Sequence, residues 1–232
     1  METVRHSNER GAANFGWLDS RHTFSFGHYH DPRYMGFGPL RVINEDRVQP
    51  ARGFDTHGHR DMEIISYVIS GALRHEDSMG NVSIIRPGDV QRMTAGTGVR
   101  HSEYNASDED DAHFLQIWIE PEAQNLPPGY EQKTFGNAEK TNRLRLVVSR
   151  GGRDGSVSIH RDADIHAGLL ASGVSLTHEF TAGRLGWLQV VRGTLTANGL
   201  SLQAGDGLSL RDTPTLVLQA TSQSEVLLFD MG

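Results

Sequence analysis

The stretch Val68-Ile-Ser-Gly-Ala-Leu73, followed by Pro87-Gly-Asp-Val90, indicates the fold because a similar stretch occurs later in the chain. The echo consists of Val190-Val-Arg-Gly-Thr-Leu195, a turn, and Ala204-Gly-Asp-Gly207. In each copy an apolar run ends at a glycine and a second run begins at once, a pattern typical of strands joined by tight turns. Self-similarity of this kind indicates two copies of one β unit.

Short runs rich in Val, Ile, Leu and Thr recur along the whole chain, each closed by Gly, Asp or Asn. This alternation of short strands and turns is typical of an all-β sandwich or barrel, and the sequence has no long amphipathic helix. The predicted strands cover residues 40–43, 62–69, 82–85, 114–119, 144–148, 187–191, 216–218 and 226–229.

A loop rich in proline and glycine lies between the two copies of the repeat. It covers residues 120–129 and has the composition of a linker. We therefore predict an N-terminal domain over residues 1–125 and a C-terminal domain over residues 126–232.

The composition excludes several classes of protein. The 232 residues contain no Cys, which rules out disulfides, thiolate nucleophiles and cysteine-ligated metals. A net charge of −7 disfavours direct contact with nucleic acid. The chain has no apolar run of about 18 residues and no apolar segment of the signal-peptide type at its start, so we expect no membrane contact and a cytoplasmic location.

Histidine is concentrated in the first half of the chain, and its spacing predicts a metal site. His57 and His59 are two residues apart, as are His101 and Glu103, so each pair faces one side of a regular strand. Facing strands would bring the four side chains together. Three imidazoles and one carboxylate suit a divalent transition metal with open coordination positions.

Two further residues extend the same patterns at even steps. Glu63 follows His59 and Asn105 follows Glu103, and the combined spacings have a chance of occurrence of about one in a thousand. We expect these two side chains to orient the ligand imidazoles, with a plain structural role as the alternative for Glu63.

The other histidines are expected to be structural. His22 and His75 are interpreted as hydrogen-bonded histidines rather than ligands, and the pair His28-Tyr-His30 as a coincidence in a loop. The C-terminal half has no His-x-His or His-x-Glu spacing, so we expect its domain to hold no metal.

The residues around the predicted ligands resemble the double motif of cupins and, more narrowly, the bacterial pirin-like proteins. The resemblance is close over residues 5 to about 130 and general thereafter. The matching stretches are Gly16–Phe26, Met35–Asn44, His57–Glu63, His75–Asn81 and Thr94–Asn105.

The resemblance to pirins implies a bicupin, with two β-barrel (double-stranded β-helix) domains in one chain. It implies one metal per chain held by His57, His59, His101 and Glu103, usually iron as Fe(II), with Mn, Co, Ni, Cu or Zn as other possibilities. For bacterial members it implies quercetin 2,3-dioxygenase activity, in which a flavonol ring is opened with O2 and CO is released. Glu103, the lone anionic ligand, would take the proton of the flavonol 3-hydroxyl group.

Two other functions are compatible with the same ligands. One is a non-enzymatic, iron-containing regulator that reports redox state to a protein partner. The other is a metal-dependent sugar-phosphate isomerase, which would need basic side chains at the metal. Arg60 and Arg100 flank the motifs but lie at odd steps from the ligands, so they are expected to point away. The sequence leaves the oligomeric state open.

A flavonol pocket should be largely apolar. A glycine-interrupted segment before the metal motif carries aromatic and Met side chains that could form its rim. We expect them instead to pack against the flank of the N-terminal barrel. These residues are Phe24, Phe26, Tyr29, Met35 and Phe37.

Overall fold

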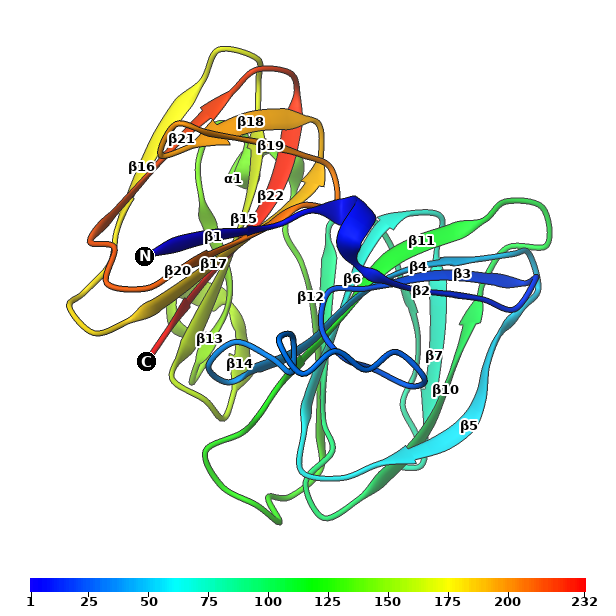
Figure 1. The fold of residues 1–232 in the computed structure, drawn as a ribbon. Helices are drawn as coiled ribbons and strands as arrows, with labels where there is room; N and C mark the ends of the chain where they lie inside the picture. Colours follow the sequence, from blue (N-terminus) through cyan, green and yellow to red (C-terminus); the bar gives the residue numbers. More distant parts are fainter. The chain divides into compact units, whose positions relative to one another are not determined.

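The computed structural model describes all 232 residues, and its regular secondary structure is almost entirely β-strand (Figure 1). The chain divides into two compact units. The N-terminal unit comprises Gly11–Thr134 and Val157–Arg161. The C-terminal unit comprises Met1–Arg10, Phe135–Ser156 and Asp162–Gly232.

Two antiparallel sheets pack face to face in the N-terminal unit. One has the strand order β12-β9-β6-β11-β4-β3-β2 and the other β5-β10-β7-β8. Val68, Leu73 and Phe114 belong to a buried apolar cluster that draws on both sheets. The strands are β2 (Gly11–Asn14), β3 (Leu18–His22), β4 (Leu40–Val48), β5 (Gly53–His59), β6 (Glu63–Ser70), β7 (Leu73–Asp77), β8 (Val82–Ile85), β9 (Asp89–Thr94), β10 (Val99–Asn105), β11 (Ala112–Ile119) and β12 (Gly129–Thr134), with β14 (Val157–Ile159) in the same unit.

The C-terminal unit repeats this plan. Its sheets have the orders β1-β20-β17-β22-β15-β13 and β16-β21-β18-β19. The elements are β1 (Glu2–Arg5), η1 (Ser7–Glu9), α1 (Asn137–Lys140), β13 (Arg145–Arg150), η2 (Arg153–Gly155), β15 (Ala163–Leu170), β16 (Ser175–Glu179), β17 (Leu185–Arg192), β18 (Thr194–Ala197), β19 (Leu200–Gln203), β20 (Gly207–Leu210), β21 (Thr215–Ala220) and β22 (Ser224–Met231). None of the helices is long enough to span a bilayer.

The internal repeat is visible as two equivalent turns. Gly71 joins β6 to β7 and Gly193 joins β17 to β18, with φ of 73° and 79°. A Cβ atom on Gly71 would lie 2.5 Å from the carbonyl oxygen of Asp111, and one on Gly193 would collide with the carbonyl oxygen of Gln223. Both turns therefore need glycine for the left-handed backbone and for the close approach.

The structure confirms the all-β, two-barrel fold and each of the predicted strands. The division of the chain is more complex than the two continuous domains predicted. The loop at 120–128 leads into β12, which pairs with β9, so the N-terminal unit continues past residue 125 to Thr134. Strand β1 pairs with β20, which places Met1–Arg10 in the C-terminal unit.

Candidate metal centre and cavity

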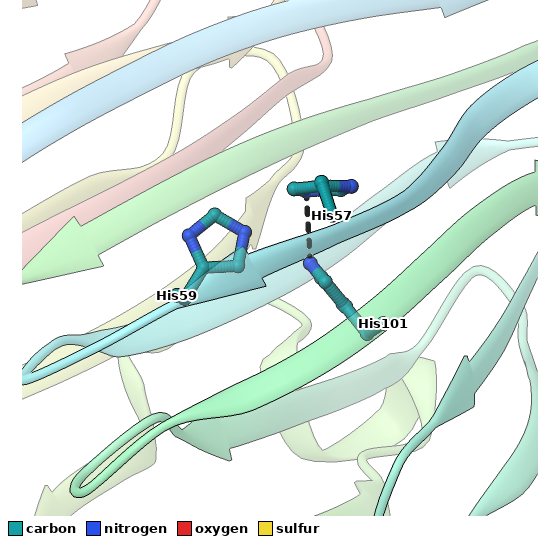
Figure 2. A group of neighbouring side chains, drawn as sticks. All are labelled: His57, His59 and His101. Carbon is teal, nitrogen blue, oxygen red and sulfur yellow. Dashed lines mark hydrogen bonds between the residues drawn. The ribbon is translucent and has the colours of Figure 1, made fainter.

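Strands β5 and β10 bring the three predicted ligand histidines together. The two strands are antiparallel, with His57 opposite His101 and His59 opposite Val99. His57 and His59 point to the same face because they are two residues apart on one strand. Figure 2 shows the three imidazoles converging on one space. One nitrogen of each lies within 4.8 Å of the others.

The spacing of these nitrogens fits a shared metal ion. The Nε2 atoms of His57 and His101 are 3.2 Å apart. Two ligand nitrogens at about 2.1 Å from one ion are about 3.0 Å apart in octahedral and about 3.4 Å apart in tetrahedral geometry. The three rings also lie close together, with centroids 4.6–4.9 Å apart.

The protonation state of the histidines also suits metal binding. Burial, together with repulsion from the neighbouring imidazoles, lowers the pKa of His101 to about 2. Burial and the nearby His57 lower the pKa of His59 to about 4. Both rings are therefore neutral at physiological pH, as metal coordination requires.

Glu103 lies next to His101 but is held by other partners. It forms a second group with His75 and His101, whose ligand atoms lie within 4.8 Å of one another. Its Oε1 accepts a hydrogen bond from Ser66 Oγ (3.1 Å) and its Oε2 one from Gln116 Nε2 (2.6 Å). Each carboxylate oxygen has a second lone pair, so coordination by Glu103 is compatible with both contacts.

The pKa of the Glu103 carboxyl group is among the most strongly shifted in the chain. Only 2% of the residue is exposed, and this burial raises its pKa to about 7. Repulsion from Asp46 adds to the rise, while hydrogen bonds from Ser66 and Gln116 oppose it. Before any metal binds, this group can therefore hold or release a proton near neutral pH.

A cavity of about 670 Å³ opens beside the histidines, within the range of pockets for small aromatic ligands. His57, His59 and Glu103 form part of its wall. Much of the remaining wall is apolar or aromatic, namely Ala12, Ala13, Phe15, Trp17, Leu18, Phe26, Tyr29, Phe54 and Trp118. A smaller set is polar, including Ser20, Asn44, Asp46 and Gln116.

The segment of residues 23–39, which precedes the predicted ligand histidines, contributes more to this cavity than expected. Phe26 and Tyr29 line the wall, so the expectation that they only pack the barrel flank is wrong for these two. Phe24 and Phe37 are buried away from the cavity as expected, and Met35 is 39% exposed. The difference arises because residues 23–39 form an irregular segment rather than a strand with regular alternation.

The structure corrects the roles expected for Glu63 and Asn105. Strand β5 ends at His59 and the chain turns at Asp61, where φ is 50°, so Glu63 lies on another strand. There it accepts hydrogen bonds from Thr94 Oγ1 (2.8 Å) and from the backbone N–H of His160 (3.2 Å).

Asn105 is the last residue of β10, and its side chain holds neighbouring backbone segments together. Its side-chain amide donates to the backbone carbonyls of Val48 (3.0 Å) and Asp110 (2.8 Å). Neither Glu63 nor Asn105 hydrogen-bonds to an imidazole of the predicted ligands.

Other groups orient the predicted ligand histidines, and the residue types of these groups do not identify them in the sequence. His57 Nδ1 donates to the backbone carbonyl of Asp55 (2.8 Å), which leaves Nε2 with its lone pair. His75 is completely buried and lies between Asp77 and His101. Burial lowers the pKa of His75 in spite of Asp77, so this ring is neutral. In the sequence, only the even spacing of His75 and Asp77 indicates that these two side chains share one face of a strand.

The basic residues beside the motifs point away from the site. Arg60 donates to Asn125 Oδ1 (2.5 Å) and Arg100 to the backbone carbonyl of Thr56 (3.5 Å), and neither lines the cavity. The cavity therefore lacks the cationic side chains that a sugar-phosphate substrate would require.

One metal ion per chain is expected, because the C-terminal barrel is filled with apolar side chains. Leu188, Leu216, Leu218 and Leu228 are all fully buried in its core cluster. Metal analysis against protein concentration checks this expectation. A second equivalent retained by a variant lacking His57 and His101 would contradict it.

Two family models match the chain. The Pirin model covers residues 3–119, and the model of the quercetinase C-terminal cupin domain covers residues 146–231. A protein of Escherichia coli K12 named quercetin 2,3-dioxygenase is 47% identical over 100% of this chain and 99% of its own.

Two solved structures are similar throughout. The crystal structure of YhhW from E. coli matches with a TM-score of 0.97 and 46% identity, over 100% of this chain and 98% of that one. The structure of bacterial pirin YhhW in complex with nickel(II) matches with a TM-score of 0.95 and 46% identity, over 100% and 99%.

Proposed function

We propose, on the premise that this chain belongs to the pirin family, that it is a metal-dependent dioxygenase that opens the ring of flavonols such as quercetin with O2 and releases CO. The observation that carries the proposal is the group formed by His57, His59 and His101. His57 and His59 share the wall of a largely apolar cavity with the buried carboxylate of Glu103. The name of the E. coli relative supports the same activity.

We assign the metal ligands as His57, His59, His101 and Glu103. The proposed ion is Fe(II). Ni is equally compatible with the nitrogen-rich donor set, and the E. coli pirin has been solved in complex with nickel(II). Mn, Co, Cu or Zn also suit such ligands. When bound, the ion supplies open coordination positions and Lewis acidity toward oxygen atoms.

Glu103 is proposed as the catalytic base. It faces the cavity, where a flavonol 3-hydroxyl group would come within reach of its carboxylate. A pKa of about 7 in the metal-free protein is close to the value that favours proton transfer at neutral pH. Ser66 and Gln116 donate to its two oxygens and so hold the carboxylate in a fixed orientation while the proton is taken.

The apolar wall would hold the flavonol rings and exclude water. Phe26 and Trp118 pack edge to face with ring centroids 5.3 Å apart, and Trp118 packs in the same way against His59 at 5.0 Å. These rings form a continuous aromatic surface leading to the histidines. A flat aromatic substrate can stack on such a surface.

The experiment that tests the proposal is oxygen consumption by the iron-loaded and nickel-loaded protein on a panel of flavonols. Flavones, which lack the 3-hydroxyl group, are the matched control substrates. We expect uptake with flavonols only. Absence of uptake with every flavonol would favour the regulator acting through a protein partner. The cytoplasmic location stays a prediction from the sequence.

A further inference from the structure

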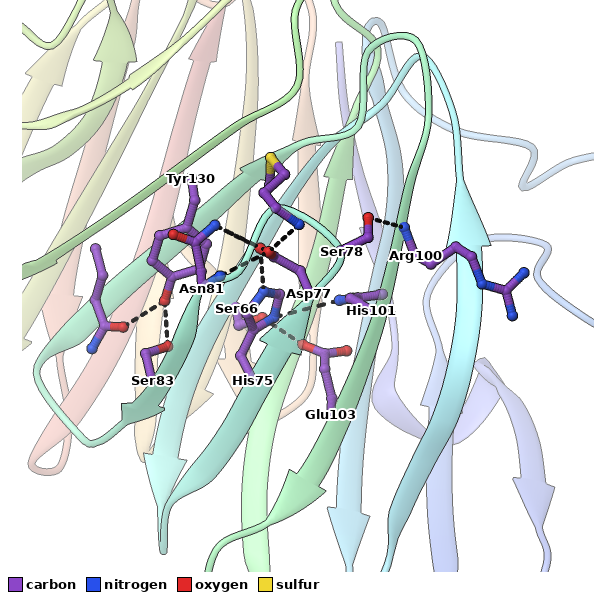
Figure 3. A network of polar contacts seen from close by, with 12 residues as sticks. Ser66, His75, Asp77, Ser78, Asn81, Ser83, Arg100, His101, Glu103 and Tyr130 are labelled. Carbon is purple, nitrogen blue, oxygen red and sulfur yellow. Dashed lines mark hydrogen bonds and ion pairs between the residues drawn. The ribbon is translucent and has the colours of Figure 1, made fainter.

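A chain of hydrogen bonds runs from Asp77 through His75 to the ligand His101 (Figure 3). Asp77 Oδ2 is 3.0 Å from His75 Nε2, and His75 Nδ1 is 3.4 Å from His101 Nδ1. His75 and Asp77 lie on β7, which pairs directly with β10, and His75 is 0% exposed. The flavonol chemistry proposed above makes no use of either residue.

The direction of the first hydrogen bond follows from the other partners of Asp77. Its Oδ1 accepts from the backbone N–H groups of Met79 (2.9 Å) and Asn81 (3.1 Å), and its Oδ2 accepts from Asn81 Nδ2 (2.9 Å). With all of these partners donating, Asp77 acts only as an acceptor. His75 must therefore carry its proton on Nε2.

The direction of the second hydrogen bond follows from the first. A neutral imidazole with its proton on Nε2 presents a lone pair on Nδ1. His75 Nδ1 therefore accepts, and His101 must donate from its own Nδ1. This leaves the lone pair of His101 on Nε2, the nitrogen that lies 3.2 Å from His57 Nε2 in the proposed metal centre.

We propose that the Asp77–His75 pair is a positioning device that fixes His101 in the tautomer able to bind metal. The inference deepens the proposed function and rests on its assignment of His101 as a ligand. Tyr130 supports the device, because its ring packs against that of His75 with centroids 5.1 Å apart. Partners of ligand histidines commonly set the tautomer, and losing them typically lowers metal affinity about 10- to 100-fold.

The sharpest test is Asp77→Asn, which keeps the shape of the side chain and reverses the polarity of one hydrogen bond. The Asn oxygen would retain the backbone donors of Met79 and Asn81, so its amide would donate to His75 Nε2. His75 would then donate from Nδ1, and His101 would carry its proton on Nε2. We expect ¹⁵N NMR of the metal-free variant to show this change of tautomer, and nickel titration to show about 10- to 100-fold weaker binding.

A second pair of variants keeps Asp77 and changes His75. His75→Gln retains an oxygen that can accept from His101 Nδ1, whereas His75→Leu removes the acceptor. We expect nickel affinity to fall more for His75→Leu than for His75→Gln. Asp230→Asn is the matched control, because Asp230 accepts from His178 Nε2 (2.8 Å) in the other unit, and its nickel affinity should match that of the unmodified protein.

The proposal is overturned if Asp77→Asn folds, keeps the proton of His101 on Nδ1 and binds nickel normally. If Asp77→Asn does not fold, equal nickel affinity for His75→Gln and His75→Leu overturns it instead. These measurements use nickel and no flavonol. They therefore succeed or fail separately from the flavonol activity, which is read from oxygen consumption alone.

Discussion

The His57→Ala and His101→Ala proteins are expected to lose nearly all of their bound metal while remaining folded. Each change removes one of two nitrogens that lie 3.2 Å apart, and the remaining ligands cannot enclose an ion as tightly. The fold should persist because buried apolar side chains between the sheets, not the metal, supply most of the stability.

Metal content per chain after purification checks this expectation, with circular dichroism and a thermal melt to verify folding. His30→Ala is the matched control, because His30 belongs to the other His-x-His pair and lies exposed in a loop. Full metal occupancy in both folded ligand variants would show that the ion is held elsewhere.

The Glu103→Gln protein is expected to bind metal more weakly but still measurably, and to lose about 10²- to 10⁴-fold in flavonol-dependent oxygen uptake per bound metal. Glutamine keeps one oxygen donor and can maintain hydrogen bonds with Ser66 and Gln116, but it lacks the basicity to take the substrate proton. Three histidines would still hold the ion.

Oxygen consumption is normalised to bound metal and measured at equal flavonol concentration. Glu45→Gln is the control, because Glu45 is a largely buried carboxylate paired with His113 (2.9 Å) and does not line the cavity. Turnover close to normal in Glu103→Gln would leave Glu103 as a structural ligand only.

The fold could be predicted from the sequence because its strands are marked by apolar runs that end at glycines such as Gly71 and Gly193. The assignment of Met1–Arg10 to the C-terminal unit could not be predicted from the sequence. It depends on pairing between β1 and β20, which are some 200 residues apart, and no local pattern records such a pairing.

The grouping of His57, His59 and His101 could be predicted, because residues two positions apart on a strand share one face and the two strands pair. Glu63 does not lie beside these histidines, because the chain turns at Asp61 and the strand does not continue to residue 63. Ser66 and Gln116 could not be found, because they are ordinary residue types that reach Glu103 only when the two sheets face each other.

The proposed dioxygenase reaction can be followed by supplying isotopically labelled dioxygen to the iron-loaded protein with quercetin and analysing the products. We expect both labelled atoms to enter the ring-opened product and CO to be released in equal amount. Flavonol oxidation without CO, with the label recovered as hydrogen peroxide or water, would contradict the proposed reaction.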